Sequence, residues 1–599
     1  MLKSRPEPEA VVILQRLRNG DDVGSLVSLI KAGDLMTELK TSKNSSPNSE
    51  LSQPLQSMLN LHHPNAYPPL PPLGDPRAEL GQREKNIFRV SPDDEELLSR
   101  EDIENARSLE QPRAVFDDRL KRVVAARWTK VTENDNVVIN LISLYLSWDH
   151  TTLRTLDEDY FLDDLSAGGS EYCSPLLVNA MLCAASLNYA TIDPATSRRL
   201  GPRFFAEAEK LWAAEKTQSS TLMQVPAAIF LSMWCRSSGL EELSTGFISE
   251  AVRLAEELGL FDMESQEIDQ REPHLHRIWR GRAVIAWGLF NWQTIHGFYL
   301  NMAPRIRNPP HFALGPEFRG EGRQQYPWNP FPLIRPYQIF YKDLIFKAYS
   351  DLFALLFEYL RVHDASNPTA ERALEYQHTS LLHVKMLEWA DDLPVELLRG
   401  PESLPMVIDL HMFYHGIIIG IYRPFTEAQC LMKRLARETM QASSSQLMRL
   451  LYIQRYRFDG PPFTSMTIGS VHILTFSLFE ELAKAEDVGP ETSFYLVLCA
   501  EAMKQYGDAY AAVHKLLYDL IGKAKRGGRT IPEGIDLIFK DLETRLSRRD
   551  IDGDAYKKCP IDIQIAITDP SGSRVQDMVK ATYSLDADGM QGIRLEDGE

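Results

Sequence analysis

The strongest constraint on this sequence is a helical repeat of apolar residues that runs almost unbroken from Val137 to Leu546. Apolar side chains recur every three or four residues, for example over 204–212 and 247–258, which is typical of helices that bury one face. The stretch 411–422 is apolar on nearly all sides and predicts a helix at the centre of a bundle. Because strand patterns are nearly absent, we expect an all-α fold, a large multi-helix bundle around one core, and not an α/β nucleotide enzyme.

The distribution of proline, glycine and charge divides the sequence into four segments. We expect a short helical segment over 1–40, a Pro-rich and charged linker over 41–136 that is largely disordered, and a helical domain over 137–546. The remaining residues, 547–599, are predicted to form a short, mostly irregular tail. Within the domain, eight prolines and three glycines over 304–336 predict a long irregular excursion between two helices.

The charge balance weighs against direct nucleic-acid binding by this chain. Its 65 Lys and Arg residues and 83 Asp and Glu residues give a net charge of -18, so most of the surface would repel phosphates. The most basic run, 523–529, is compatible with a nuclear import signal. It follows an apolar helical repeat, however, and we favour the interpretation that its cations lie at the C-terminus of a helix.

The six cysteines are scattered, and no two of them have C-x-x-C spacing. This excludes a zinc ribbon or zinc cluster built from the chain's own thiols, and we expect no metal or other cofactor in it. Since most of the cysteines lie in apolar stretches, we expect buried free thiols in a reducing compartment. No run of eighteen apolar residues occurs and the first residues lack the apolar core of a signal peptide, so we expect an intracellular protein that does not span a membrane.

A search for catalytic and metal-binding motifs gives near-misses that fail for physical reasons. The sequence has no G-x-x-x-x-G-K-[ST], G-x-S-x-G or H-E-x-x-H pattern. The pairs Asp163-Asp164 and Asp391-Asp392 lack a third carboxylate one turn later that would share a magnesium ion, and we interpret them as solvent-exposed acids. The calcium-like run 550–554 has its glycine at loop position four instead of six, and Ile561 stands where a chelating side chain is needed.

Two pairs of histidines lack a third metal ligand nearby. His62 and His63 lie in the expected linker, and His274 and His276 follow Pro273. Two imidazoles alone make a weak metal site, and we expect the second pair to lie on the surface at the start of a helix.

Four aromatic residues are candidates for an effector pocket. Trp279, Trp287, Phe290 and Trp292 fall within one helical repeat, and such side chains can line a cavity for a small molecule. By periodicity alone they are ordinary core residues, which is the interpretation we favour. The alternative function is an all-helical enzyme with a pocket near Trp287 and Trp292, which predicts carboxylates or histidines converging in a cavity with shifted pKa values.

Short motifs follow one another in a fixed order along the helical region. The most informative are Trp148-Asp149-His150, Tyr172-Cys173-Ser174-Pro175-Leu176-Leu177, Asn179-Ala180, Ala251-Val252-Arg253-Leu254-Ala255, Trp287-Gly288-Leu289-Phe290 and Tyr422-Arg423-Pro424-Phe425. In this order they resemble the regulatory (middle homology) domain of fungal zinc-cluster transcription factors, over roughly Val137 to Leu546. The resemblance implies a fungal transcriptional regulator that acts on RNA polymerase II transcription in the nucleus.

Members of that family usually carry six closely spaced cysteines that hold two zinc ions and place a short helix in the major groove of DNA. These cysteines have no counterpart in the sequence, so we assign no zinc ligand and no DNA-binding residue to it. We expect DNA binding to come from an upstream zinc cluster or from a partner. We further expect contacts with the transcription machinery or coactivators, a homodimer or a DNA-binding partner, and a small-molecule effector.

Overall fold

The computed structural model describes residues 55–70 and 115–548 with internal gaps. The gaps are 217–218, 262–272, 301, parts of 313–337, 363–371, 401–402, 427–430, 458–465, 485–488 and 528. The helical segment predicted over 1–40, the calcium-like run and nearly all of the predicted tail lie outside the described residues.

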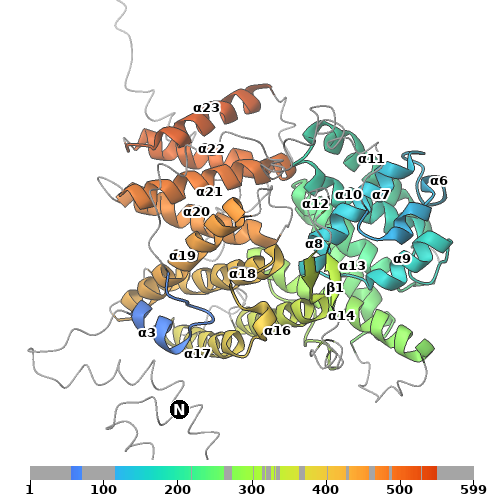
Figure 1. The fold of residues 1–599 in the computed structure, drawn as a ribbon, viewed down its shortest axis with the longest axis horizontal. Helices are drawn as coiled ribbons and strands as arrows, with labels where there is room; N and C mark the ends of the chain where they lie inside the picture. The colour runs from blue at the N-terminus through green and yellow to red at the C-terminus, as the bar shows by residue number, and fades with distance from the viewer. Residues whose placement is uncertain are drawn as a thin grey trace, which may run out of the picture.

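Helices make up most of the described chain, which confirms the all-α prediction (Figure 1). The elements before the excursion are α3 (Leu55–His62), η2 (Asp118–Arg122), α6 (Ala125–Trp128), α7 (Asp135–Ser147), α8 (Asp149–Thr152), α9 (Glu158–Ala167), α10 (Pro175–Tyr189), α11 (Pro194–Glu215), α12 (Gln224–Ser237), α13 (Glu241–Glu257) and α14 (Pro273–Leu300). The later elements are β1 (Tyr326–Trp328), β2 (Gln338–Phe340), α16 (Lys342–Val362), α17 (Arg372–Asp391), η3 (Val395–Leu397), α18 (Pro405–Tyr422), η4 (Arg423–Phe425), α19 (Leu431–Arg457), α20 (Met466–Lys484), α21 (Pro490–Ala509), α22 (Ala511–Arg526) and α23 (Glu533–Arg548).

The predicted excursion separates α14 from α16, and in its described part it contains one antiparallel pair of short strands, β1 and β2. The pair is fastened to the end of α7 by two tryptophans. The indole nitrogen of Trp328 donates to the carbonyl of Ser147 at 2.7 Å, and that of Trp148 donates to the carbonyl of Phe331 at 2.6 Å. The excursion is therefore irregular, as the proline content predicts, but aromatic residues pack it onto the helices.

Local sequence explains where several helices begin and end. The side chain of Asp157 caps α9 by accepting hydrogen bonds from the backbone nitrogens of the second and third residues that follow it. Ser174 caps α10 in the same way, with proline in the first helical position. Gly168 and Gly259 adopt left-handed backbone angles after α9 and α13, positions at which glycine commonly ends a helix.

The apolar side chains form two core clusters, so the prediction of one core is wrong. The first cluster extends from Leu59 through the amino-terminal helices, and the second extends through the carboxy-terminal helices to Leu542. Helix α18 contributes to both, for example with Phe413 to the first and Met412 to the second. A helix that is apolar all round can serve a core on each side, and the periodicity of single faces does not reveal this.

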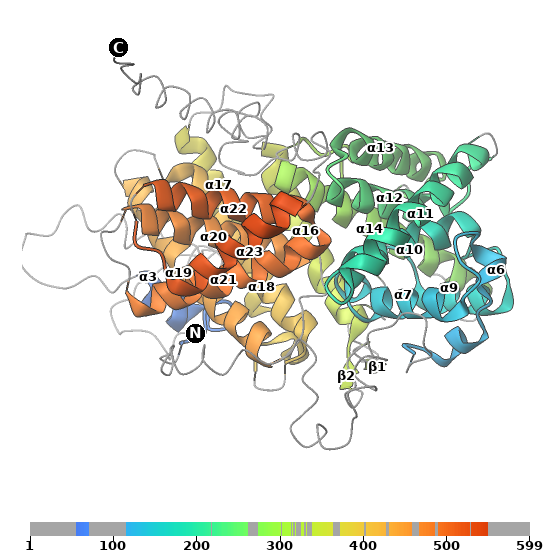
Figure 2. The same cartoon turned by 90° about the horizontal axis from the view of Figure 1, so that it is seen from above.

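Helix α18 is buried along its whole length, which confirms the prediction of a central helix over 411–422. Within the described part of the chain, Pro405–Phe425 is the one helix long and apolar enough to cross a membrane by length and composition. It lies entirely inside the bundle. Figures 1 and 2 show it between the helices of the two core clusters.

The disordered linker predicted over 41–136 is wrong for two segments. Residues 55–70 form α3 and a turn in which Tyr67 is completely buried, and residues 115–136 include η2 and α6 with buried Leu120 and Trp128. Proline-rich composition suggested a flexible chain, but a few apolar side chains are enough to fix each segment on the bundle.

Candidate functional site: a buried ion network

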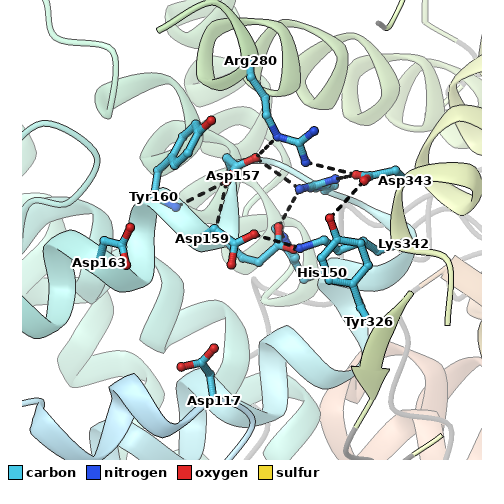
Figure 3. A network of polar contacts seen from close by, with 12 residues as sticks. Asp117, His150, Asp157, Asp159, Tyr160, Asp163, Arg280, Tyr326, Lys342 and Asp343 are labelled. Carbon is cyan, nitrogen blue, oxygen red and sulfur yellow. Dashed lines mark hydrogen bonds and ion pairs between the residues drawn. The ribbon is translucent and has the colours of Figure 1, made fainter. Parts of the chain in front are cut away.

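Six charged side chains are buried together where the start of α9 meets α14 and α16 (Figure 3). We call them the ion network: Arg154, Asp157, Glu158, Arg280, Lys342 and Asp343. Each exposes between 2% and 8% of its surface. Charged groups are seldom buried to this extent unless they are paired, because removal from water costs several kcal/mol per ion. The pairing within the network therefore decides what it can do.

Each carboxylate of the ion network is shared between two cations. Asp157 accepts from Arg280 Nε at 2.8 Å and lies 3.3 Å from a guanidinium nitrogen of Arg154. Asp343 lies 2.6 Å from Arg154 and 3.2 Å from Arg280. Glu158 lies 2.8 Å from Arg154 and also contacts Lys342. Three negative and three positive charges thus balance within one buried cluster.

The chain brings part of this network together locally and part of it through the fold. Arg154 precedes Asp157 by three residues and Glu158 by four, a spacing that places these side chains next to one another at the start of a helix. One oxygen of Asp157 caps α9 while the other pairs with the arginines. The ion network therefore fixes the start of α9 against α14 and α16.

Further polar and aromatic groups surround the ion network. His150 lies 3.1 Å from Glu158, and Lys342 also contacts Asp159 at 3.1 Å. The Tyr326 ring, which comes from β1, lies 3.6 Å from the Lys342 ammonium nitrogen, and Phe318 lies 4.8 Å from the Arg280 guanidinium. The excursion thus covers the network and shields it from water.

The electrostatics hold these groups in fixed charge states. Burial would raise the pKa of Glu158, but Arg154 and Lys342 hold it well below its usual value. Burial would lower the pKa of Arg280, but Asp157 and Asp343 raise it. Burial lowers the pKa of His150, and this effect exceeds the opposing effect of Glu158. Glu158 therefore stays ionised and the His150 imidazole stays neutral near pH 7.

This arrangement is suited to joining helices. A general acid or base needs a pKa near the working pH and access to a substrate, whereas Glu158 is ionised far below neutrality and its oxygens are occupied by cations. The enzyme alternative predicted converging carboxylates or histidines near Trp287 and Trp292. The structure does bring carboxylates and a histidine together, but in a charge-balanced cluster. The part of the chain that the structure describes contains no group of three His, Cys, Asp or Glu residues that could hold a metal ion.

The four aromatic candidates for an effector pocket do not all share one set of neighbours. The indole nitrogen of Trp287 donates to the carbonyl of Phe312 in the excursion at 3.4 Å, and the Trp279 ring lies 5.8 Å from the Phe312 ring. The indole nitrogen of Trp292 donates instead to the Ser232 hydroxyl on α12 at 3.2 Å. Phe290 is fully buried with its ring 5.6 Å from that of Trp287. The role of the four residues in effector binding stays a prediction.

In the acidic pairs, Asp163 and Asp392 are exposed, as the sequence predicted, whereas Asp164 and Asp391 are only partly exposed. Asp163 pairs with Arg119 at 2.8 Å, and Asp164 accepts a hydrogen bond from the backbone nitrogen of Tyr172 at 2.6 Å. Asp391 ends α17 and lies 2.7 Å from His63. Partners distant in the sequence explain these corrections, because residue spacing does not identify them.

Several smaller predictions are confirmed. His274 is exposed in the first turn of α14, as expected. Cys173, Cys183, Cys235 and Cys499 are buried free thiols, and burial raises the pKa of Cys499 to about 12. The described part of the basic run lies at the end of α22, where helix C-termini favour cations.

Sequence reasoning missed the ion network. The spacing of Arg154, Asp157 and Glu158 was a usable signal, since it matches pairs on one helix face. Arg280, Lys342 and Asp343 lie more than a hundred residues further along the chain, and no spacing rule connects them to it.

Comparison with known proteins identifies a domain in the first part of the helical region. The sequence model of the fungal specific transcription factor domain matches residues 142–311, a range that includes four of the six ion-network residues. The nitrogen assimilation transcription factor nit-4 of Neurospora crassa is 26% identical over 58% of this chain and 33% of its own length. The nitrogen assimilation transcription factor nirA of Emericella nidulans is 27% identical over 70% of this chain and 48% of its own length.

A third relative extends the comparison to a biosynthetic regulator. The notoamide biosynthesis transcriptional activator notL' of Aspergillus versicolor is 25% identical over 72% of this chain and 70% of its own length. The chain spans a third to a half of the length of the first two relatives. No solved structure matches the chain significantly. The chain is thus similar to fungal transcription factors, and its residues 142–311 match the fungal specific transcription factor domain.

Proposed function

We propose that this chain is the regulatory and effector part of a fungal transcriptional regulator that acts in the nucleus on RNA polymerase II transcription. The observation that carries the proposal is the transcription factor domain at residues 142–311, together with relatives named as transcription factors or activators. Two relatives are named for nitrogen assimilation and one for the biosynthesis of a natural product. Genes of nutrient assimilation or secondary metabolism are therefore the proposed targets.

The proposed division of labour places DNA recognition outside the described helical body. The net charge of -18 opposes contact with DNA phosphates over most of the surface. A zinc cluster upstream of these residues or a DNA-binding partner, including a second copy, supplies base recognition in this proposal. The helical body then contacts coactivators or the transcription machinery and responds to a small-molecule effector.

The ion network supports a relay role for the matched domain. It links the start of α9 to Arg280 on α14 and to Asp343 on α16, so displacement of one helix strains contacts to the other two. Buried charge pairs have a strict geometry, because a pair that separates leaves ions without water or partner. Such a body transmits a change at one surface to another as a movement of packed helices.

A tethering experiment tests the proposal. The whole chain is fused to a foreign DNA-binding module and expressed in a fungal host with a reporter gene that carries the matching operator. We expect the fusion to activate or repress the reporter several-fold relative to the module alone. The matched variants are Arg154→Ala, which breaks the ion network, and Arg253→Ala, which removes an exposed ion pair with Glu257. A folded, nuclear fusion that leaves the reporter unchanged in both directions contradicts the proposal.

A further inference from the structure

The segment 55–70, which we call the N-terminal clasp, is docked on a distant part of the fold. Figures 1 and 2 show α3 beside α19, away from α6, the next α-helix drawn along the chain. Residues 63–68, which follow α3, enter a groove formed by α17, α18 and α19 and by Arg399 between α17 and α18. The clasp therefore connects the amino-terminal region directly to the carboxy-terminal helices.

The groove recognises the main chain of the clasp. His415 Nε2 donates to the carbonyl of Ala66 at 3.0 Å, and the Arg399 guanidinium donates to the same carbonyl. Gln446 Nε2 donates to the carbonyl of Pro68 at 2.8 Å. Side chains from three parts of the bundle thus donate hydrogen bonds to backbone carbonyl oxygens. Proteins commonly bind peptides through such main-chain hydrogen bonds.

One aromatic side chain anchors the clasp. Tyr67 is fully buried, its hydroxyl lies 2.8 Å from that of Ser443, and its ring lies 5.1 Å from the imidazole of His415. At the edge of the groove, the Asn65 amide donates to the carbonyls of Ala390 and Asp391 at 3.2 Å each. A central buried aromatic residue with a polar rim is the usual arrangement of a binding anchor.

The groove side chains are organised around an occupant that offers hydrogen-bond acceptors. Arg399 donates to Gln446 Oε1 at 2.9 Å, which fixes both side chains in place. Burial lowers the pKa of Arg399 to about 9, so its charge is strongly desolvated. If the clasp left and nothing replaced it, the donors of Arg399, His415 and Gln446 would lose acceptors in a partly buried site, which is costly. Such a groove favours either the clasp or another peptide over an empty state.

We infer that the groove between α17, α18 and α19 is a peptide-binding site whose bound peptide is residues 63–68 of the chain itself. The clasp is held by the buried side chains of Leu59, Ala66 and Tyr67, whereas Leu61 on its outer face is exposed. The clasp is a dissociable internal ligand, and a peptide with the same Asn-Ala-Tyr-Pro turn competes with it. This inference concerns binding only and does not depend on the proposed role in transcription.

Competition with a labelled peptide tests the inference. A fluorescent peptide of residues 55–70 is titrated with the full chain, and fluorescence anisotropy reports binding. In the wild-type chain, the tethered clasp has a high effective concentration and excludes the peptide. In the full-length Tyr67→Ala chain, the weakened clasp no longer competes, and we expect the peptide to bind at least about tenfold more tightly than to wild type. The Leu61→Ala chain serves as the matched control and is expected to behave like wild type.

A variant peptide and a second variant chain serve as further tests of the inference. A peptide that itself carries Tyr67→Ala must not bind, because it lacks the anchor. If Tyr67→Ala unfolds the chain, Asn65→Ala replaces it, since this change removes only the contacts at the groove edge, and a smaller gain in peptide affinity is expected. A folded Tyr67→Ala chain that binds the peptide no more tightly than wild type overturns the inference. So does an Asn65→Ala chain without any gain after Tyr67→Ala has unfolded.

Discussion

The ion network and the clasp groove both bury polar side chains, but they do so with opposite chemistry. In the ion network, Arg154 and Arg280 neutralise Asp157 and Asp343 at distances of 2.6 to 3.3 Å. In the groove, histidine, glutamine and arginine side chains donate to main-chain carbonyls, as His415 does to Ala66. Charge pairs bind fixed helices to one another, whereas main-chain carbonyls are offered by any peptide of suitable shape. The comparison therefore separates a permanent connection from an exchangeable one.

The two regions also differ in how protons affect them. Opposite charges keep the pKa of Glu158 well below its usual value. In the groove, burial lowers the pKa of His383 and of His411 from 6.5 to about 3, and it lowers that of His415 well below 6.5. The network thus depends on groups that must stay charged, and the groove on imidazoles that must stay neutral.

The largest expected effect comes from breaking the ion network. Arg154→Ala removes the cation shared by Asp157, Glu158 and Asp343, and leaves buried negative charge without full compensation. We expect a loss of about 3–5 kcal/mol in the free energy of unfolding, because removing one partner of a buried pair has this cost. Urea denaturation followed by circular dichroism measures it.

The matched control is another arginine in an ion pair. Arg253 lies 2.7 Å from Glu257 on α13, but both side chains are 53% exposed, so Arg253→Ala is expected to cost at most about 1 kcal/mol. If both variants lost the same small amount of stability, the ion network would not be the fixed connection that we infer.

The second prediction concerns acid. A buried histidine whose folded pKa is lowered stabilises the fold fully above its unfolded pKa of 6.5, and this contribution declines as pH falls below 6.5. At pH 5.5 we expect His383 and His411 each to have cost about 1 kcal/mol of stability. Asp391 and Arg399 line the same groove, and His63 of the clasp lies 2.7 Å from Asp391. Glu158 of the ion network still contributes at this pH, because its pKa is held well below 4.5 in the fold and its stabilisation declines only below 4.5.

Hydrogen exchange measured by mass spectrometry at pH 7 and pH 5.5, after correction for intrinsic rates, shows which region loses protection first as the pH falls. Residues 55–70 and helices α17 and α18 should lose protection before α9 does. His150 lies next to the ion network, and burial lowers its pKa against the opposing effect of Glu158 at 3.1 Å. Equal loss of protection in both regions would remove the distinction between them.

The sequence predicted the features that depend on local spacing and missed those that depend on contacts between distant residues. Periodicity located the helices and the central helix α18, because a buried face repeats every three or four residues wherever the partner lies. Periodicity did not predict the ion network, although the spacing of Arg154, Asp157 and Glu158 matches pairs on one helix face. It did not place Arg280 or Lys342 there, since their partners are brought together only by the fold.

The clasp was beyond sequence reasoning for another reason. Prolines at 64, 68 and 69 are typical of a flexible linker, and the composition of the segment does not show that Tyr67 has a prepared site more than three hundred residues away. The two cores were missed because α18 has no polar face to divide them. A single helix with two buried sides has the same sequence pattern as one deeply buried in a single core.

The third prediction tests how closely α14 approaches the ion network. A Cβ atom at Gly288 would lie 2.4 Å from the carbonyl oxygen of Arg154 and 2.9 Å from Cα of Thr155. Because these are backbone atoms, Gly288→Ala must displace α14 from the start of the network, and we expect a loss of about 1–3 kcal/mol. Thermal unfolding measures the loss. An unchanged melting temperature would show that α14 and the network are not in rigid contact.

The smallest expected effect comes from Gly246→Ala, which serves as the control for Gly288→Ala. Gly246 lies inside α13, and a Cβ added there meets nothing within 4 Å, so Gly246→Ala changes helix propensity without changing packing. Alanine is favoured over glycine inside a helix, and we expect a gain of about 0.5–1 kcal/mol in the same thermal measurement. The difference between the two variants then isolates the cost of the close approach at Gly288. If Gly246→Ala destabilised the protein as much as Gly288→Ala, the loss at Gly288 would reflect general helix disturbance and not contact with the ion network.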